Sequence, residues 1–393
     1  MNKRSVRDLD VRGKRVLVRV DFNVPVKNGE VTDDTRIRRA IPTIKYLLEQ
    51  GARPILISHL GRPKGEPDPK YAMDPVAKRL EKLLGAPVLK LDAAVGPEVE
   101  EALNERDGEG VVLLENSRFY PGETKNDPEF SEQLASLADL YVDDAFGAAH
   151  RAHATVVGVA ELLPAAAGLL LEEELDNLDK ILRDPERPFV AILGGAKVSD
   201  KLGVIESLLQ VADTILIGGA MCFTFFRAQG YETGNSLVEE DYLDEAKRLM
   251  DEAGEKLVLP VDIVAAEEMK ENASTRVVKV EEFPPDLMGL DIGPETVEKF
   301  KSYIKGARTI FWNGPMGVFE IDAFAKGTEG IARAVAESDA ISIVGGGDSV
   351  AAVRKLGLEN EMSFISTGGG ASLEYVEGKE LPGVAVLPEK EGV

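Results

Sequence analysis

Residues Val16 to Pro25 read Val-Leu-Val-Arg-Val-Asp-Phe-Asn-Val-Pro, and this stretch decides the fold class. Its density of valine and leucine is typical of a parallel strand that is covered on both faces. A buried polar group without a partner costs on the order of 1 to 3 kcal/mol. We therefore expect Arg19, Asp21 and Asn23, which end this strand, to face a ligand.

Short apolar runs of the same kind alternate with helical patterns along the whole chain. The expected strands are 54–57, 111–114, 140–142, 189–193, 214–217, 257–261, 309–312 and 341–344. One helical pattern begins at Asp74-Pro75 and stops at Gly85, and another begins at Ser199. The alternation predicts an α/β fold of parallel sheets sandwiched by helices, with ligands at the carboxyl ends of the strands.

Length and composition narrow the function classes. The 393 residues exceed the roughly 250 to 300 at which a single core stops growing, so we expect two domains. A net charge of −23 argues against a nucleic-acid or membrane surface, so a phosphorylated substrate would need a local basic patch. The single cysteine, Cys222, is expected to be buried and inert, as in a reducing cytosol. No apolar segment follows the N-terminus, and the sequence predicts a cytoplasmic protein.

Basic residues gather at the expected strand ends of the first half. His59 and Arg62 follow the strand 54–57 across a turn at Gly61, and Arg118 and Arg151 follow two further strands. The planar fork of arginine suits carboxylate and phosphate oxygens, so these side chains together predict an anion site.

Arg36 stands in the first turn of a helix that begins near Asp33-Asp34-Thr35. A cation there opposes the helix dipole by ~0.3 to 1 kcal/mol, so either the two aspartates or an anionic ligand must compensate it. The sequence leaves both explanations open. Arg38 and Arg39 of the same helix are expected to be solvated surface residues.

Two histidines, His150 and His153, lie three residues apart. No cysteine and no clear third ligand accompanies them, which disfavours a zinc site and favours packing or a place at the edge of the substrate.

The second half carries glycine-rich turns between strands and helices. Gly345-Gly346-Gly347-Asp348-Ser349 and Gly368-Gly369-Gly370 each follow an apolar run, and such turns aim backbone N–H groups at an anion. Neither fits the Walker or dinucleotide pattern. Lys197 and Lys201 flank Ser199 at an expected helix start, where cations are misplaced unless an anion lies in front of them.

These motifs resemble those of the phosphoglycerate kinase family, and the matching blocks span nearly the whole chain. The blocks are Val16 to Pro25, Ser58 to Arg62, Leu114 to Phe119, Asp143 to Gly147, Gly194 to Lys201, Trp312 to Glu320, Gly345 to Ser349 and Ser366 to Ser372. The resemblance implies two similar-sized, Rossmann-like domains with a cleft between them. It divides the chain into a first domain 1–170, an interdomain helix and second domain 171–372, and a segment 373–393 that returns to the first domain.

The resemblance also implies the reaction and its residues. A phosphoryl group would move between 1,3-bisphosphoglycerate and ADP, with Mg²⁺ and with closure of the two domains. The residues implied for 3-phosphoglycerate are Asp21, Asn23, Arg36, His59, Leu60, Gly61, Arg62, Arg118 and Arg151. Those implied for ADP or ATP are Lys197, Lys201, Gly293, Glu320, Gly345, Gly346, Gly347, Asp348 and Ser349, with Gly218, Gly219, Leu290 and Pro315 as further walls of the adenine pocket. Catalysis would fall to Arg36, Lys201, Gly347 and Gly370, and magnesium to Asp348.

The implied partners are these small molecules alone, on a monomer without nucleic acid or membrane. Two alternatives were weighed against this hypothesis: a kinase of the same fold for another small carboxylate, and a nucleotide-binding regulatory protein that has lost catalysis. The first should have changed some of the substrate residues, and the second should have lost Arg36, Lys201 or a glycine turn. All of them are retained.

Overall fold

The computed structural model describes residues 2–106 and 109–390, and these fall into two compact units. Unit 1 runs to Asp176 and resumes at Glu380, and unit 2 comprises Asn177–Lys379. Both boundaries lie a few residues beyond 170/171 and 372/373. The reason is local, because the first turns of helix α6 (Leu169–Arg183) are bonded within unit 1 and helix α13 (Gly370–Val376) packs against a helix of unit 2.

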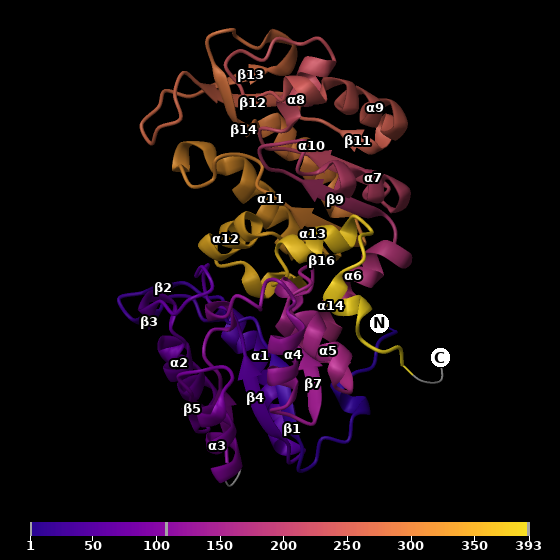
Figure 1. Cartoon of the computed structure of the whole chain (residues 1–393). Helices are drawn as coiled ribbons and strands as arrows, with labels where there is room; N and C mark the ends of the chain where they lie inside the picture. The colour runs from indigo at the N-terminus through magenta and orange to yellow at the C-terminus, as the bar shows by residue number, and fades with distance from the viewer. Residues whose placement is uncertain (1, 107–108, 391–393) are drawn as a thin grey trace. The chain divides into compact units, whose positions relative to one another are not determined.

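Unit 1 is built on a six-stranded sheet whose paired strands are all parallel (Figure 1). Across the sheet the strands are β5 Val88–Lys90, β6 Val111–Leu113, β4 Arg53–Ile57, β1 Arg15–Arg19, β7 Leu140–Asp143 and β8 Ala165–Ala167. Its helices are α1 Thr35–Glu49, α2 Asp74–Leu84, α3 Pro97–Glu105, α4 Pro128–Ala135, α5 Val159–Leu162 and α14 Pro382–Ala385. A short hairpin, β2 Val26–Lys27 and β3 Glu30–Val31, follows the quoted stretch.

Strand β1 occupies the centre of that sheet, as its composition requires. Its residues from Val16 onward are buried, and Val16 and Val18 belong to the main core of the unit. The prediction of a parallel strand covered on both faces is confirmed, and the polar residues that follow it lie at the carboxyl edge of the sheet.

Unit 2 repeats this architecture around a second parallel sheet (Figure 1). Across the sheet the strands are β11 Leu257–Val258, β10 Thr214–Ile217, β9 Phe189–Leu193, β15 Thr309–Asn313, β16 Ile341–Gly345 and β17 Phe364–Ile365. Its helices are α7 Leu202–Val211, α8 Cys222–Ala228, α9 Leu243–Ala253, α10 Pro294–Gly306, α11 Lys326–Ala336, α12 Gly347–Lys355 and α13. The fold class expected from the sequence, parallel sheets flanked by helices, is thus confirmed for both units.

A small antiparallel sheet in unit 2 departs from the expected all-parallel arrangement. Strand β12 Asp262–Ala266 lies between β13 Arg276–Lys279 and β14 Met288–Ile292. Strand β13 exposes three of its four residues, so it lacks the continuous apolar run that the expected strands share. Strands β12 and β14 were not among the expected strands either.

Element ends differ from the expectations by more than one residue at two places. The expected strand 257–261 pairs only over β11, because Pro260 has no N–H to donate to a ladder. Helix α7 begins at Leu202 rather than near Ser199, since the Ser199 backbone N–H and hydroxyl both donate to Glu239 and cap nothing. The expected stop of α2 at Gly85 is confirmed, with φ +69°.

The prediction that Arg39 is a solvated surface residue is wrong. Its side chain is half-buried and lies 3.2 Å from Glu173 of α6. Arg38 is more exposed and pairs with Asp34 at 2.8 Å. In the described part of the chain, no helix has the length and apolar character that crossing a bilayer requires.

Candidate active site

Arg36 is held by the loop that follows strand β1. Its Nη1 donates to the Asp21 carboxylate at 3.2 Å and to the backbone oxygen of Asn23 at 3.1 Å. The two aspartates that could have compensated it are engaged elsewhere, because Asp33 accepts from Thr35 and Asp34 pairs with Arg38 and Arg79. Of the two explanations that the sequence left open, compensation by Asp33 and Asp34 therefore finds no support in these contacts.

The turn at Gly61 ties three of the candidate residues together. The Gly61 N–H donates to Asn23 Oδ1 at 2.9 Å, and its carbonyl accepts from Arg118 Nη1 at 2.9 Å. Gly61 has φ +63°, and a Cβ built on it would lie 2.2 Å from the ring of Tyr71. Only glycine fits this turn, which brings Asn23 and Arg118 to one backbone segment.

The other candidate residues of unit 1 differ in how far their side chains are exposed to solvent. Leu60 is buried in the core, so only its backbone is free to serve a ligand. His59 is buried, whereas Arg62 and Arg151 are exposed. Burial lowers the pKa of His153, which was considered with His150, to about 4. Within 2–106 and 109–390 there is no group of three or more metal-ligating side chains.

A strong local positive potential surrounds His59. Burial lowers the pKa of His59 well below its usual range, and Arg19, Arg118, Arg36 and His153 lower it further. Buried Nε atoms of Arg19 and Arg118 have no hydrogen-bond partner among the described residues. A buried cation without a compensating anion is costly, so an anion would be favoured beside this cluster.

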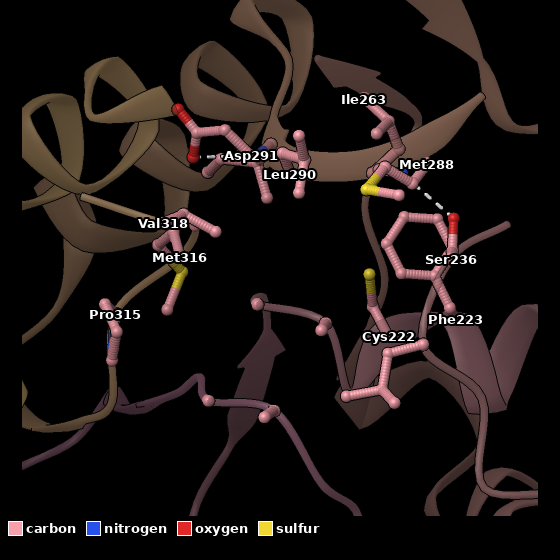
Figure 2. Close-up of a pocket in the computed structure, with 18 of the residues that line it drawn as sticks. Cys222, Phe223, Ser236, Ile263, Met288, Leu290, Asp291, Pro315, Met316 and Val318 are labelled. Atoms are coloured by element: carbon pink, nitrogen blue, oxygen red, sulfur yellow. Dashed lines mark hydrogen bonds between the residues drawn. The ribbon is translucent and has the colours of Figure 1, made fainter. Parts of the chain in front are cut away.

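Unit 2 contains a cavity of about 700 Å³ beyond the carboxyl ends of its central strands. Pro315, Met316 and Val318 line one side, and Cys222, Phe223 and Met288 line the other (Figure 2). Of the expected wall residues, Gly219, Leu290 and Pro315 line this cavity, and so do Glu320 and Asp348. An apolar cavity with a few carboxylates at its margin suits a planar heterocycle that carries polar substituents.

Two expected wall residues, Gly293 and Gly218, are not among the lining residues, and both are packed tightly against a neighbouring side chain. A Cβ on Gly293 would lie 2.3 Å from the Asp262 carboxyl carbon, and Gly293 precedes helix α10 as its N-cap. A Cβ on Gly218 would lie 2.4 Å from Met316 Sδ. Both glycines allow close packing behind the cavity. Among the lining residues that the sequence did not assign to the pocket are Cys222 and Asp291.

Cys222 is the first residue of α8 and is buried, as expected. Burial raises the pKa of its thiol, which keeps the sulfur unreactive. Asp291 is also buried, which raises its pKa to about 7, and it accepts from the Gly327 N–H at 2.7 Å in the first turn of α11. Asp291 thus anchors this helix to the wall of the cavity.

The glycine turn after β16 is held in place by hydrogen bonds from buried side chains. Asn313 Nδ2 donates to the Gly345 carbonyl at 2.9 Å, and Asn313 Oδ1 accepts from the buried Lys201 ammonium. Ser349 is fully buried, and its hydroxyl accepts from the Gly314 N–H at 2.6 Å, so this hydroxyl braces the loop. Helix α12 begins at Gly347, which leaves Gly347 and Asp348 exposed in its first turn.

The second glycine run has the same form. Gly369, with φ +53°, is the N-cap of α13, and Gly370 is its first residue. Ser366 and Ser372 hydrogen-bond at 2.6 Å beneath the turn. Lys197, by contrast with Lys201, is exposed. Two helix N-termini and two lysines thus belong to the unit that holds the cavity, a combination that suits phosphate groups.

Comparison with known proteins identifies the family. A family model described as phosphoglycerate kinase matches residues 6–379. The chain belongs to the phosphoglycerate kinase family. The phosphoglycerate kinase of Rubrobacter xylanophilus is 77% identical over 393 residues and all of both chains, and that of Moorella thermoacetica is 60% identical over 99% of this chain and 100% of its own.

Solved structures agree with the family and with the fold. A phosphoglycerate kinase structure from Coxiella burnetii matches with a TM-score of 0.89 and 42% identity, and one from Pyrococcus horikoshii with a TM-score of 0.84 and 33% identity. Each comparison covers 98% of both chains. The chain is accordingly a phosphotransferase with the activity of phosphoglycerate kinases, the transfer of a phosphoryl group between 1,3-bisphosphoglycerate and ADP.

Proposed function

We propose that the cationic cluster of unit 1 binds 3-phosphoglycerate and 1,3-bisphosphoglycerate. The residues assigned to this site are Asp21, Asn23, Arg36, His59, Leu60 through its backbone, Gly61, Arg62, Arg118 and Arg151. One observation carries the proposal: Arg36, in the first turn of α1, is tied to Asp21 and Asn23 beside a buried histidine that other cations surround. A multiply charged anion would offset that potential.

We propose further that unit 2 binds ADP or ATP in its cavity. The assigned residues are Lys197, Lys201, Glu320, Gly345, Gly346, Gly347, Asp348 and Ser349, with Ser349 and Gly293 acting through the backbone they support. Glu320 is exposed in the cavity lining, where a carboxylate can accept from ribose hydroxyls. The backbone N–H groups of the glycine turns then bind the phosphate groups of the nucleotide.

The reaction needs no general base, because the acceptor is already an oxyanion in either direction. Catalysis must come from alignment and from neutralising the charge on the transferred phosphoryl group. Arg36 in unit 1, and Lys201 with the N–H groups of Gly347 and Gly370 in unit 2, are the groups we assign to that work. Transfer in line requires a closing movement that also excludes water.

Magnesium would accompany the nucleotide. It favours one or two carboxylates together with phosphate oxygens and water, and Asp348, an exposed carboxylate in the cavity lining, fits that donor set. The ion would screen charge on the phosphate oxygens. We propose a cytoplasmic monomer that acts on these small molecules without nucleic acid or membrane, in keeping with its charge of −23 and its single cysteine.

A coupled assay tests this proposal. ATP formation from 1,3-bisphosphoglycerate and ADP is expected, and it should fall when magnesium is chelated and recover when magnesium is restored. Activity only with a different carboxylic acyl phosphate would favour a kinase for another substrate. Nucleotide binding without any turnover would favour a regulatory protein.

The substrate site should be sensitive to salt. The screening length is ~8 Å at physiological ionic strength and ~3 Å at 1 M. Added salt should therefore weaken the attraction between several arginines and a multiply charged anion. We expect the KM for 3-phosphoglycerate to rise steadily with added sodium chloride, and sulfate to compete beyond this general effect. A KM that ignores salt, together with no competition by sulfate, would contradict a basic anion site.

Gly61→Ala should weaken substrate binding. The new Cβ would lie 2.2 Å from Tyr71 at a φ of +63°, so the turn must shift and carry Asn23 and Arg118 with it. A strain of ~1 to 3 kcal/mol is typical, and a rise of roughly tenfold in the KM for 3-phosphoglycerate is expected. Gly85→Ala is the matched control, since Gly85 has φ +69° with nothing within 4 Å of its Cβ. It should lower the melting temperature and leave KM unchanged. Equal KM values for the two variants would argue against the role of the turn.

A further inference from the structure

Arg19 makes an unusual contact at the end of strand β1. Its side chain is 1% exposed, Nη1 donates to the Val20 carbonyl at 2.6 Å, and Nη2 lies 2.8 Å from His59 Nδ1. Among the described residues no ion pair involves Arg19, and its Nε has no hydrogen-bond partner. One of the few hydrogen bonds of the Arg19 guanidinium is therefore made to an imidazole nitrogen of His59.

This contact decides the state of His59. Arginine remains protonated in proteins and can only donate hydrogen bonds, so His59 Nδ1 must accept. An accepting Nδ1 carries no proton, which makes the imidazole neutral and puts its single proton on Nε2. The protonated imidazole would turn an N–H toward a guanidinium N–H at 2.8 Å, which is repulsive in charge and in geometry.

The groups that surround His59 act in the same direction. Arg19 approaches from β1, Arg36 from α1, Arg118 from the short helical turn Ser117–Phe119, and His153 from the loop before residue 154. Burial and these four groups all lower the pKa of His59. Asp143 lies near Arg19, but its own burial raises its pKa to about 7.

We propose that Arg19 is a positioning residue, which fixes His59 as the neutral Nε2–H tautomer so that it offers one uncharged hydrogen-bond donor to an oxygen of bound phosphoglycerate. The proposal rests on the assignment of His59 to the substrate site. Its consequence is that His59 adds no pH dependence of its own to substrate binding in the range in which histidines ordinarily titrate, and any pH dependence that remains comes from other groups, such as the substrate phosphate, whose second pKa is ~6. The positive charge of the site then comes from arginines alone.

Nitrogen NMR on the intact enzyme tests the tautomer directly. The chain has three histidines, so the ¹⁵N-labelled imidazole signals can be assigned with His150→Gln and His153→Gln variants. We expect His59 to show an unprotonated Nδ1 and a protonated Nε2, without change from about pH 5 to pH 8, a range that spans the ordinary pKa of histidine. A protonated Nδ1, or titration within that range, would overturn the proposal whatever the variants do.

Two substitutions test the cause. Arg19→Met removes the donor with little change in length, and Arg19→Lys retains a cationic donor. For Arg19→Met we expect His59 to titrate or to mix tautomers, and the KM for 3-phosphoglycerate to rise roughly tenfold and to depend more steeply on pH than in the wild-type enzyme, at nearly constant kcat. Arg19→Lys should restore the tautomer. If folded Arg19→Met kept the wild-type tautomer, Arg19 would not be the residue that fixes it.

A third variant separates this proposal from the assignment of the site. His59→Gln should raise the KM for 3-phosphoglycerate if His59 contacts the substrate. An unchanged KM in that variant would remove His59 from the substrate site and with it the functional part of the proposal, while the tautomer measured in the wild-type enzyme would still stand.

Discussion

Arg36→Ala is expected to lower kcat by at least about two orders of magnitude while the KM for 3-phosphoglycerate changes much less. Arginines that neutralise the phosphoryl group in other transfers contribute ~10³ to 10⁵ in rate. An interaction that strengthens only in the transition state appears in kcat rather than in KM. The contacts of Arg36 with Asp21 and Asn23 hold its guanidinium in place before substrate binds, so little reorganisation is needed.

The matched control is Arg38→Ala, two residues along the same helix. Arg38 is largely exposed, and its partner Asp34 keeps a second ion pair with Arg79. Exposed ion pairs contribute ~0 to 1 kcal/mol, so this variant should retain nearly full turnover. Steady-state kinetics on both proteins, with circular dichroism to verify folding, decides the matter. Similar kcat values would show that Arg36 is not catalytic, even in a chain of this family.

Arg36 also shows what the sequence could and could not predict about the site. Its position at a helix start indicated that something must compensate its charge, and two adjacent aspartates offered a local answer. That answer fails because Thr35 donates to Asp33, and Asp34 is shared between Arg38 and Arg79, which comes from 45 positions away along the chain. The contact with Arg79 depends on how α2 packs, which no local pattern contains.

The same distinction explains which elements of the fold were predictable. Strand β1 and the end of α2 at Gly85 follow from buried apolar runs and from a glycine in the left-handed region, both of which are local features. The start of α7 was misplaced, and several strands, β5, β8, β12, β13 and β14, were not predicted. Ser199 resembles a helix cap but binds Glu239, 40 residues away, and β13 is too exposed to be recognised by its apolar residues. Propensity is a weak guide where tertiary contacts compete with it.

Buried polar contacts hid several functional details as well. Ser349 was assigned to the nucleotide, but its hydroxyl accepts from Gly314. Asn313 lies in a matching motif but was given no role, and it connects Lys201 to Gly345. Arg19 was recognised as out of place in a strand, and only its contact with His59 indicates a role. The sequence thus identified the polar residues that needed an explanation, while their partners required the folded chain.

Lys201→Ala is expected to lower kcat at saturating ADP or ATP by at least about two orders of magnitude. Burial lowers the pKa of Lys201, and the nearby Asp200, Glu377 and Asp348 oppose that effect. Phosphate oxygens would likewise raise the pKa of Lys201 and favour its ammonium form. The attraction between this ammonium and the transferred group is therefore strongest when that group carries the most negative charge. Lys305→Ala, which changes an exposed lysine of α10, should leave kcat unaltered and serves as the control for loss of a lysine in unit 2.

Removal of Lys201 also deprives Asn313 Oδ1 of its donor, so a lower rate in the alanine variant could arise from a displaced glycine turn. Lys201→Gln separates the two causes, because glutamine can still donate to Asn313 but carries no charge. If charge on the phosphoryl group is what Lys201 neutralises, Lys201→Gln should be about as slow as Lys201→Ala and should melt closer to the wild-type temperature. If Lys201→Gln kept most of the wild-type kcat, Lys201 would serve only to hold Asn313 and Gly345, and the cation that acts on the transferred group would have to be sought elsewhere in the unit.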